Sequence, residues 1–321
     1  MSARARAVLV TALVAAFSAG VVVAIAARSG GEPPPQTQAK PRAGSPPLAL
    51  DLGVRSDREA RYLRKALGLY SAGKRMQAKE IFARLDSLEA RVGQELAAWP
   101  HGTLAGLSRL AALYPKSALV QLELGLAVFW AGENGAPDAW RRAAVLEPDT
   151  PYAVTAGNLL YPQYARNLPT FVPAESPPPS LDGKAPLVQL AILRRSAASG
   201  SASAKLMYGV ALQRLGRPLS ARRVFDATAQ LAPADPEALV ASAVGRFDKA
   251  DPAAAFSRLG PLARRFPKSA TVRFHLGLLL LWIGSVDQAK KELRLATTVQ
   301  PGSPLALEAA RYLATLRHAG A

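Results

Sequence analysis

The chain has 321 residues, of which 50% are hydrophobic and 20% charged, so it can bury a continuous core and does not belong to the disordered classes. It contains no cysteine, which excludes disulfides, thiol catalysis and cysteine-ligated zinc. The formal net charge of +17 suggests an anionic partner, although basic side chains also serve to keep a surface solvated.

The first element expected along the chain is a membrane-spanning helix. Residues 7–27 carry no charge, and a helix of that length rises about 31 Å, close to the thickness of a hydrocarbon core. We expect residues 1–28 to form an uncleaved signal anchor, although Ala24-Ile25-Ala26 also resembles a cleavage site. Arg4 and Arg6 precede the stretch, which predicts a single-pass protein of the cell membrane with a cytoplasmic N-terminus and an extracytoplasmic remainder.

Residues 29–54 are expected to form a spacer. Ser29 to Leu48 contains six prolines and no aromatic residue. Such a segment favours a semi-rigid extended chain without a packed core, which would hold the rest of the protein away from the membrane.

Helices are predicted over residues 55–160. The first hairpin starts near residue 57, and its second helix is expected to continue to Trp99, because only Gly93 weakens it before Pro100. A further helix over 103–114 leads into a well-defined hairpin over 118–148. The small and large positions of the first hairpin are Tyr62, Gly73, Ala78 and Phe82.

An insertion follows at residues 161–186. Its seven prolines exclude a helix through most of its length. Four of its residues are too apolar for a solvated loop: Tyr161, Tyr164, Leu168 and Phe171. Two interpretations remain open. The apolar residues fold back over the helices and replace missing packing, or the loop lines or gates a binding surface.

The remaining chain predicts helical hairpins over 187–303 and a capping helix with a short tail over 304–321. Leu187 to Ala198 forms a single helix, interpreted as the remainder of a hairpin that the insertion interrupts. Regular hairpins then end at Pro233, Pro267 and Pro301, which are spaced 34 residues apart.

The same pattern of residues recurs in two distant parts of the chain. LYPKSALVQLELGLAVFWAG, ending at Gly132, aligns with RFPKSATVRFHLGLLLLWIG, ending at Gly284, and pairs Gly125 with Gly277. Two antiparallel helices approach closely only where the facing residues are small, as Gly277 and Ala289 are. Over roughly residues 55–318 the sequence therefore resembles the tetratricopeptide repeat family.

This resemblance implies an all-α fold: a right-handed α-solenoid of antiparallel helix hairpins, preceded here by one transmembrane helix. In this family the first helices line a concave groove that holds a peptide or a helix of a partner. The family's basic carboxylate clamp is missing, so a C-terminal carboxylate is not the expected ligand. Trp130 and Trp282 alternatively pack on a neighbouring repeat or on the insertion. The groove positions carried over to this chain are Leu122, Leu126, Phe129, Trp130, Leu206, Val210, Phe274, Leu278, Leu281 and Trp282.

No catalytic, metal or cofactor site is predicted. His101, His275 and His318 are far apart, and none has a second ligand at metal spacing. Glu123 stands alone between two leucines, without an acidic residue one turn away for acid–base catalysis. We therefore do not expect an enzyme.

The sequence favours an envelope scaffold that binds a protein or peptide in its apolar groove. An alternative within the family is a chaperone similar to those of cytochrome c maturation. From another class, the basic second helices could bind an anionic envelope polymer or lipid. Nucleic acid is not an expected partner, because no basic run is interleaved with aromatic residues.

Overall fold

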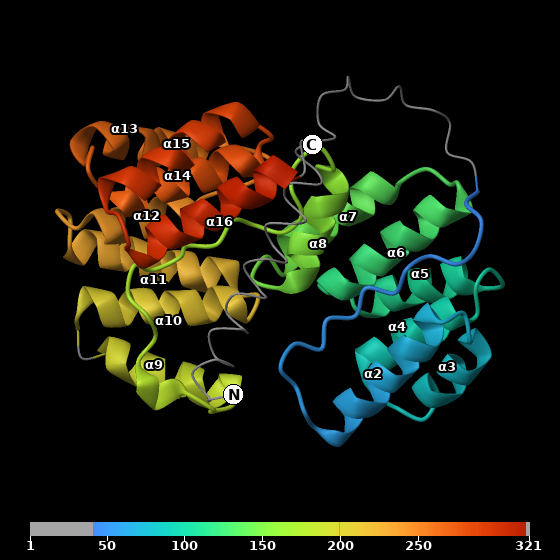
Figure 1. Cartoon of the computed structure of the whole chain (residues 1–321). Helices are drawn as coiled ribbons and strands as arrows, with labels where there is room; N and C mark the ends of the chain where they lie inside the picture. Colours follow the sequence, from blue (N-terminus) through green and yellow to red (C-terminus); the bar gives the residue numbers. More distant parts are fainter. Residues whose placement is uncertain (1–40, 199, 319–321) are drawn as a thin grey trace. The chain divides into compact units, whose positions relative to one another are not determined.

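The computed structural model describes residues 41–198 and 200–318 (Figure 1). The predicted membrane anchor at 7–27 lies outside these residues, as do the beginning of the predicted spacer and residues 319–321. Within the described ranges, no helix combines the length and the apolar character needed to cross a bilayer. The anchor and the extracytoplasmic location remain predictions.

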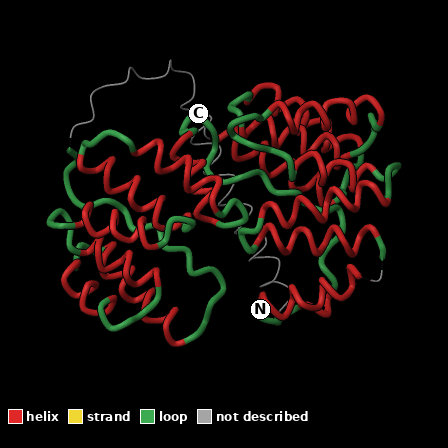
Figure 2. Tube along the Cα trace, turned by 180° about the vertical axis from the view of Figure 1, so that it is seen from behind, coloured by secondary structure: helices red, strands yellow, loops and turns green. Residues whose placement is uncertain are grey.

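The described chain is built from helices and loops, with no strand in residues 41–198 or 200–318 (Figure 2). It divides into two compact units between Leu160 and Tyr161. The described part of the N-terminal unit is residues 41–160, and that of the C-terminal unit is residues 161–318 without residue 199. Both units have the all-α hairpin architecture that the 34-residue spacing predicts.

The N-terminal unit consists of three successive hairpins in its described residues, α2/α3, α4/α5 and α6/α7, closed by α8 against α7 and α6. The first helices also contact one another in succession, α2 with α4, α4 with α6 and α6 with α8, so they form one layer. We call the surface of this layer the groove of the unit. The helices are α2 (Arg58–Ser71), α3 (Arg75–Phe82), α4 (Leu88–Ala97), α5 (Thr103–Leu113), α6 (Ala118–Ala131), α7 (Ala136–Leu146) and α8 (Pro151–Leu160).

The C-terminal unit repeats this plan with α10/α11, α12/α13, α14/α15 and the closing helix α16, and adds α9 against α10. Its groove is the surface of the layer of first helices α10, α12, α14 and α16. The helices are α9 (Pro186–Ala198), α10 (Ala202–Arg214), α11 (Pro218–Leu231), α12 (Pro236–Val244), α13 (Ala253–Arg265), α14 (Ala270–Trp282), α15 (Val286–Val299) and α16 (Pro304–His318), with a 3-10 turn, η1, at Pro179–Leu181.

Glycines allow the helices of a hairpin to approach closely, as the sequence pattern predicts. A Cβ added to Gly277 of α14 would lie 2.8 Å from Leu293 Cγ of α15 and 3.3 Å from the Ala289 oxygen. At Gly125 of α6 the added atom would lie 2.5 Å from the Trp140 ring. No side chain fits at these positions without displacing the partner helix.

The expected long helix reaching Trp99 is wrong. Helix α3 ends at Phe82, and the Ser87 hydroxyl caps a new helix, α4, by accepting from the amide of Ala90. Gly93, interpreted above as a weak point, is the close-contact residue of α4, because an added Cβ would lie 2.6 Å from the Phe82 ring. The segment is therefore two helices of neighbouring hairpins.

The insertion does not interrupt one hairpin, as the sequence suggested. Helix α8 packs in the N-terminal unit and α9 packs on α10 in the C-terminal unit. The insertion therefore begins the C-terminal unit.

Two extended segments each follow the groove of their own unit. We call residues 41–54 the N-terminal strap and residues 161–175 the C-terminal strap. The expectation that residues up to 54 form a spacer without packing is wrong for the N-terminal strap, in which Leu48, Leu50 and Leu52 are buried. An extended chain points alternate side chains to one side, so all three leucines face the unit.

Candidate functional site

The C-terminal strap is attached to the end of α14 by two hydrogen bonds. The amide of Ala165 donates to the carbonyl oxygen of Trp282, at 3.2 Å. The Trp282 indole Nε1 donates in return to the carbonyl oxygen of Asn167, at 3.3 Å. Asn167 has a positive φ of 63°, a left-handed conformation that Asn and Gly adopt most readily. The tryptophan thus fixes one end of the strap and its direction.

Side chains of three groove helices accept hydrogen bonds from strap amides. Gln213 of α10 accepts from Phe171, at 3.1 Å, and Glu237 of α12 accepts from Ala174, at 2.6 Å. His275 of α14 accepts from Val172 through Nε2, at 2.9 Å. These bonds satisfy backbone donors that an extended segment would otherwise bury without a partner.

Phe171 is the main apolar anchor of this strap. Its side chain is 2% exposed. The ring stacks on the His275 imidazole with centroids 5.0 Å apart and meets Phe225 edge-on at 5.6 Å. Burial of such a side chain contributes about 2 to 3 kcal/mol of favourable transfer free energy.

The contacts of His275 define its protonation state. Nδ1 lies 2.7 Å from the Thr271 carbonyl oxygen, which can only accept, so Nδ1 carries the hydrogen. Nε2 accepts from Val172 and therefore carries none. Burial lowers the pKa of His275 to about 4, which is consistent with this neutral tautomer.

The N-terminal strap is bound to its own groove in a similar way. The amide of Arg42 donates to the carbonyl oxygen of Trp130 at the end of α6, at 2.9 Å. The Arg42 guanidinium carbon lies 4.1 Å from the centroid of the Phe129 ring, a cation–π contact. Farther along, the amide of Ala49 donates to Glu123 Oε1 of α6, at 2.6 Å.

Two more side chains of this unit bind carbonyl groups of the strap. Trp99 Nε1 donates to Gly44, at 3.0 Å, and the Tyr70 hydroxyl donates to Pro46, at 2.6 Å. Gly44 has a φ of 80°. The strap therefore exchanges hydrogen bonds with α2, α6 and the turn after α4.

Glu123 is fully buried, and burial raises its pKa to about 8, with the Ala49 amide acting in the opposite direction. Its second oxygen, Oε2, has no hydrogen-bond partner among the described residues. A neutral carboxyl group is thus the form that this site favours at neutral pH.

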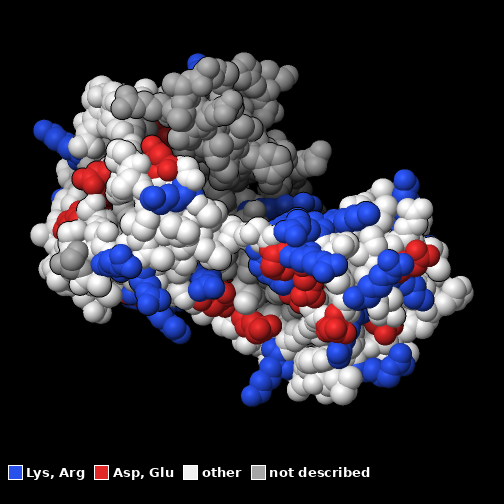
Figure 3. Space-filling view, turned by 90° about the horizontal axis from the view of Figure 1, so that it is seen from below, with Lys and Arg blue, Asp and Glu red and all other residues white. Residues whose placement is uncertain are grey.

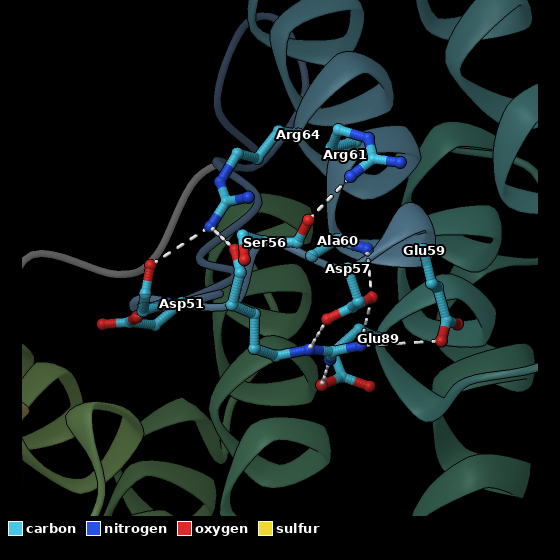
Figure 4. Close-up of polar contacts among 10 residues, drawn as sticks. Asp51, Ser56, Asp57, Glu59, Ala60, Arg61, Arg64 and Glu89 are labelled. Atoms are coloured by element: carbon cyan, nitrogen blue, oxygen red, sulfur yellow. Dashed lines mark hydrogen bonds and ion pairs between the residues drawn. The ribbon is translucent and has the colours of Figure 1, made fainter. Parts of the chain in front are cut away.

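A polar cluster fixes the end of the N-terminal strap where it enters α2 (Figure 4). The Arg64 guanidinium donates to the carbonyl oxygens of Gly53 and Arg55, at 3.1 and 2.5 Å. Arg55 pairs with Asp57, the N-cap of α2, at 3.1 Å and with Glu89 of α4 at 3.4 Å. Because these groups are partly exposed, the ion pairs mainly orient the chain.

The two straps lie in the same register. Trp130 and Trp282 lie at corresponding positions in the last turns of α6 and α14, and the two acceptors Glu123 and His275 also correspond. Arg42 and Ala49 are as far apart as Ala165 and Val172, so one alignment superposes both pairs of donors. The same alignment pairs the two left-handed residues, Gly44 with Asn167.

Most of the predicted groove residues are buried, so an open apolar channel is not observed in the described residues. Leu122, Leu126, Leu206, Val210, Phe274, Leu278, Leu281 and Trp282 are buried, whereas Phe129 and Trp130 are partly exposed. In the insertion, Phe171 is buried, and Tyr161, Tyr164 and Leu168 are partly exposed.

The sequence pattern did not indicate which polar residues hold the straps. Glu123 and His275 were candidates only for catalysis and metal binding, and Glu237 was not a candidate. The available signal was a polar residue between two large apolar residues at the same position in two aligned hairpins: Glu123 lies between Leu122 and Leu124, and His275 between Phe274 and Leu276.

The basic residue pairs lie on the second helices α7, α11, α13 and α15 and are largely exposed: Arg141 and Arg142, Arg222 and Arg223, Arg264 and Arg265, Lys290 and Lys291. Acidic side chains occur among the basic ones on the face that Figure 3 shows. Asp226, for example, pairs with Arg246 at 2.7 Å. Within the described ranges, no group of three or more His, Asp or Glu side chains could hold a metal ion.

Comparison with known proteins gives limited similarity. No protein-family model matches the chain, and no curated protein matches it. Among solved structures, a tetratricopeptide repeat protein from Parabacteroides merdae ATCC 43184 aligns over 81% of this chain and 98% of its own, with 12% identity and a TM-score of 0.35. Yeast Tom70 aligns over 94% of this chain and 55% of its own, with 14% identity and a TM-score of 0.38. At these values neither alignment identifies a ligand or a function for this chain.

Proposed function

We propose that this chain is a protein-interaction scaffold in which each unit binds an extended segment of a partner along its groove. One observation carries the proposal: both grooves already hold an extended segment through backbone amides and buried apolar side chains. The amides of Ala49 and Val172 donate to groove side chains, and Leu48 and Phe171 fill the adjoining pockets. Binding of this kind uses chemistry that any extended peptide offers.

The straps are then intramolecular ligands that a partner must displace. A short flexible tether gives the strap an effective concentration in the millimolar range, so a partner at lower concentration must bind the groove correspondingly more tightly than the strap does. The groove residues that a partner would contact are those predicted from the sequence, with Trp130 and Trp282 at the ends of the sites and Glu123, Gln213, Glu237 and His275 as amide acceptors.

We also propose that the scaffold is attached to the cell membrane by residues 7–27 and acts outside the cytoplasm. The uncharged stretch and the preceding Arg4 and Arg6 support this location. Organisation of a complex in the cell envelope fits a scaffold in that place.

In-cell photo-crosslinking tests the binding function. A photoreactive residue is placed at position 282 or 130, with and without Phe171→Ala, and captured peptides are identified by mass spectrometry. We expect a defined partner peptide whose capture at position 282 increases in the variant, because the weakened strap exposes the groove. A probe at position 295, exposed on α15, is the control. Capture of only the protein's own strap in both backgrounds would contradict the proposal.

A further inference from the structure

The two straps share a residue pattern as well as a register. Gly44 and Asn167 have positive φ, Pro46 and Pro169 are buried, and Leu48 and Phe171 are buried two residues farther on. The residues between them differ: Ser45 corresponds to Leu168, both partly buried, and Pro47 corresponds to Thr170, both exposed. Gly44 and Asn167 are themselves exposed and are held through their carbonyl oxygens, whereas the proline and the large apolar residue of each strap are buried.

We infer that both grooves recognise one pattern in an extended protein segment: Gly or Asn, then proline two residues later, then a large apolar residue two positions after the proline. The inference rests on the proposed function and names the chemistry of the partner segment. Each of the three positions has its own physical reason.

The first position requires a left-handed backbone. Its carbonyl oxygen accepts from an indole, Trp99 in one groove and Trp282 in the other. A positive φ is favourable only for Gly and, to a lesser degree, Asn or Asp. Most other side chains would disfavour the backbone geometry that this hydrogen bond needs.

The second position favours proline because the residue is buried. In the N-terminal groove the Pro46 carbonyl accepts from Tyr70. A proline brings no amide hydrogen that would need a partner there, and its fixed φ lowers the entropy lost on binding.

The third position fills an apolar pocket and distinguishes the two grooves. In the C-terminal groove the pocket is formed partly by the rings of His275 and Phe225, which favours an aromatic residue. In the N-terminal groove Leu48 packs in a cluster that also contains Leu50 and Leu52 of the same strap. We expect the C-terminal groove to prefer Phe and the N-terminal groove to accept Leu.

Peptide binding to the full chain tests the inference. The chain carries Phe171→Ala to weaken its own strap, and the probe is a fluorescent synthetic peptide with the sequence of residues 163–176. Fluorescence anisotropy then reports binding. Three further peptides carry Phe171→Ala, Asn167→Val or the control change Thr170→Ala, which alters an exposed position. We expect the first two changes to weaken binding at least 10-fold, and the control to change it less than 3-fold.

Circular dichroism establishes that the Phe171→Ala chain is folded. If it is not, Asn167→Val in the chain replaces it, because this change weakens the strap without emptying the apolar pocket. Equal binding by all four peptides would overturn the inference and leave the proposed function intact. Absence of binding at about 1 mM, the range of effective concentration for a short tether, would also overturn it. In that case partner crosslinking from position 282 would decide separately whether the scaffold function holds.

Discussion

Glu123 and His275 occupy the same position in the corresponding helices α6 and α14, and each accepts a hydrogen bond from a strap amide. Glu123 Oε1 lies 2.6 Å from the nitrogen of Ala49, and His275 Nε2 lies 2.9 Å from that of Val172. Both side chains are fully buried. One is an acid and the other a base, so protonation affects the stability of the two units in opposite directions.

Acid should loosen the C-terminal strap. The pKa of His275 is about 4 in the folded chain and about 6.5 when unfolded, so below pH 6.5 the unfolded state binds more protons. The stability of the C-terminal unit should fall by about 3 kcal/mol as the pH decreases from 6.5 to 4. A proton on Nε2 would also face the Val172 amide. Hydrogen exchange of the strap measures this loss.

His275→Gln should remove most of that pH dependence. His101→Gln is the matched control, because His101 is exposed in the other unit. An unchanged acid profile in His275→Gln would show that another group controls the strap.

A rise in pH should destabilise the N-terminal unit, because it favours a buried charge on Glu123. The pKa of Glu123 is about 8 when folded and about 4.5 when unfolded, so the unfolded state loses its proton first as the pH rises. Stability of the N-terminal unit should fall between pH 4.5 and 8. Glu123→Gln keeps an acceptor for Ala49 and should flatten this slope, whereas Glu80→Gln, at an exposed position, should not. Thermal unfolding across this pH range measures the effect. If the stability of the Glu123→Gln variant fell with pH as steeply as that of the unchanged chain, the prediction would be refuted.

The N-terminal strap should contribute to folding stability. Leu48→Ala removes a side chain that is 9% exposed, and it should destabilise the N-terminal unit by about 2 kcal/mol. Leu113→Ala, at a residue 69% exposed in the same unit, should change stability by less than about 0.5 kcal/mol. Denaturant unfolding compares the two variants. Equal effects would mean that the strap is not packed in solution.

Close helix packing should make Gly209 irreplaceable. A Cβ at this position would lie 2.2 Å from the Phe225 ring, so Gly209→Ala should cost about 1 to 3 kcal/mol. Gly68 is an exposed residue of α2, and an added Cβ there would lie within 4 Å of no atom beyond its chain neighbours and the backbone of its own helix. Gly68→Ala should therefore stabilise the helix by up to about 1 kcal/mol. Calorimetric melting distinguishes these opposite signs, and a stabilising Gly209→Ala would contradict the packing.

The sequence by itself determined the hairpins, because paired helices need small residues and helix ends at regular intervals along the chain. Pro233, Pro267 and Pro301 mark the repeat, and Gly277 faces its partner helix as the small residues predicted. Even there, Gly93 was misinterpreted, since a glycine that weakens a helix and one that permits close packing look alike in sequence. The two roles differ only in whether a side chain of a neighbouring helix, here Phe82, lies against the glycine.

Only the tertiary structure decided what the grooves contain. A strap in extended conformation has no repeat of its own, and its binding depends on partners distant in the chain, such as Glu123 for Ala49. Leu48 and Phe171 appear in the sequence as isolated apolar residues among prolines. Their burial follows from a surface that exists only after the hairpins have stacked, which is why the sequence left open whether the insertion covers the groove, and only the folded chain shows that it does.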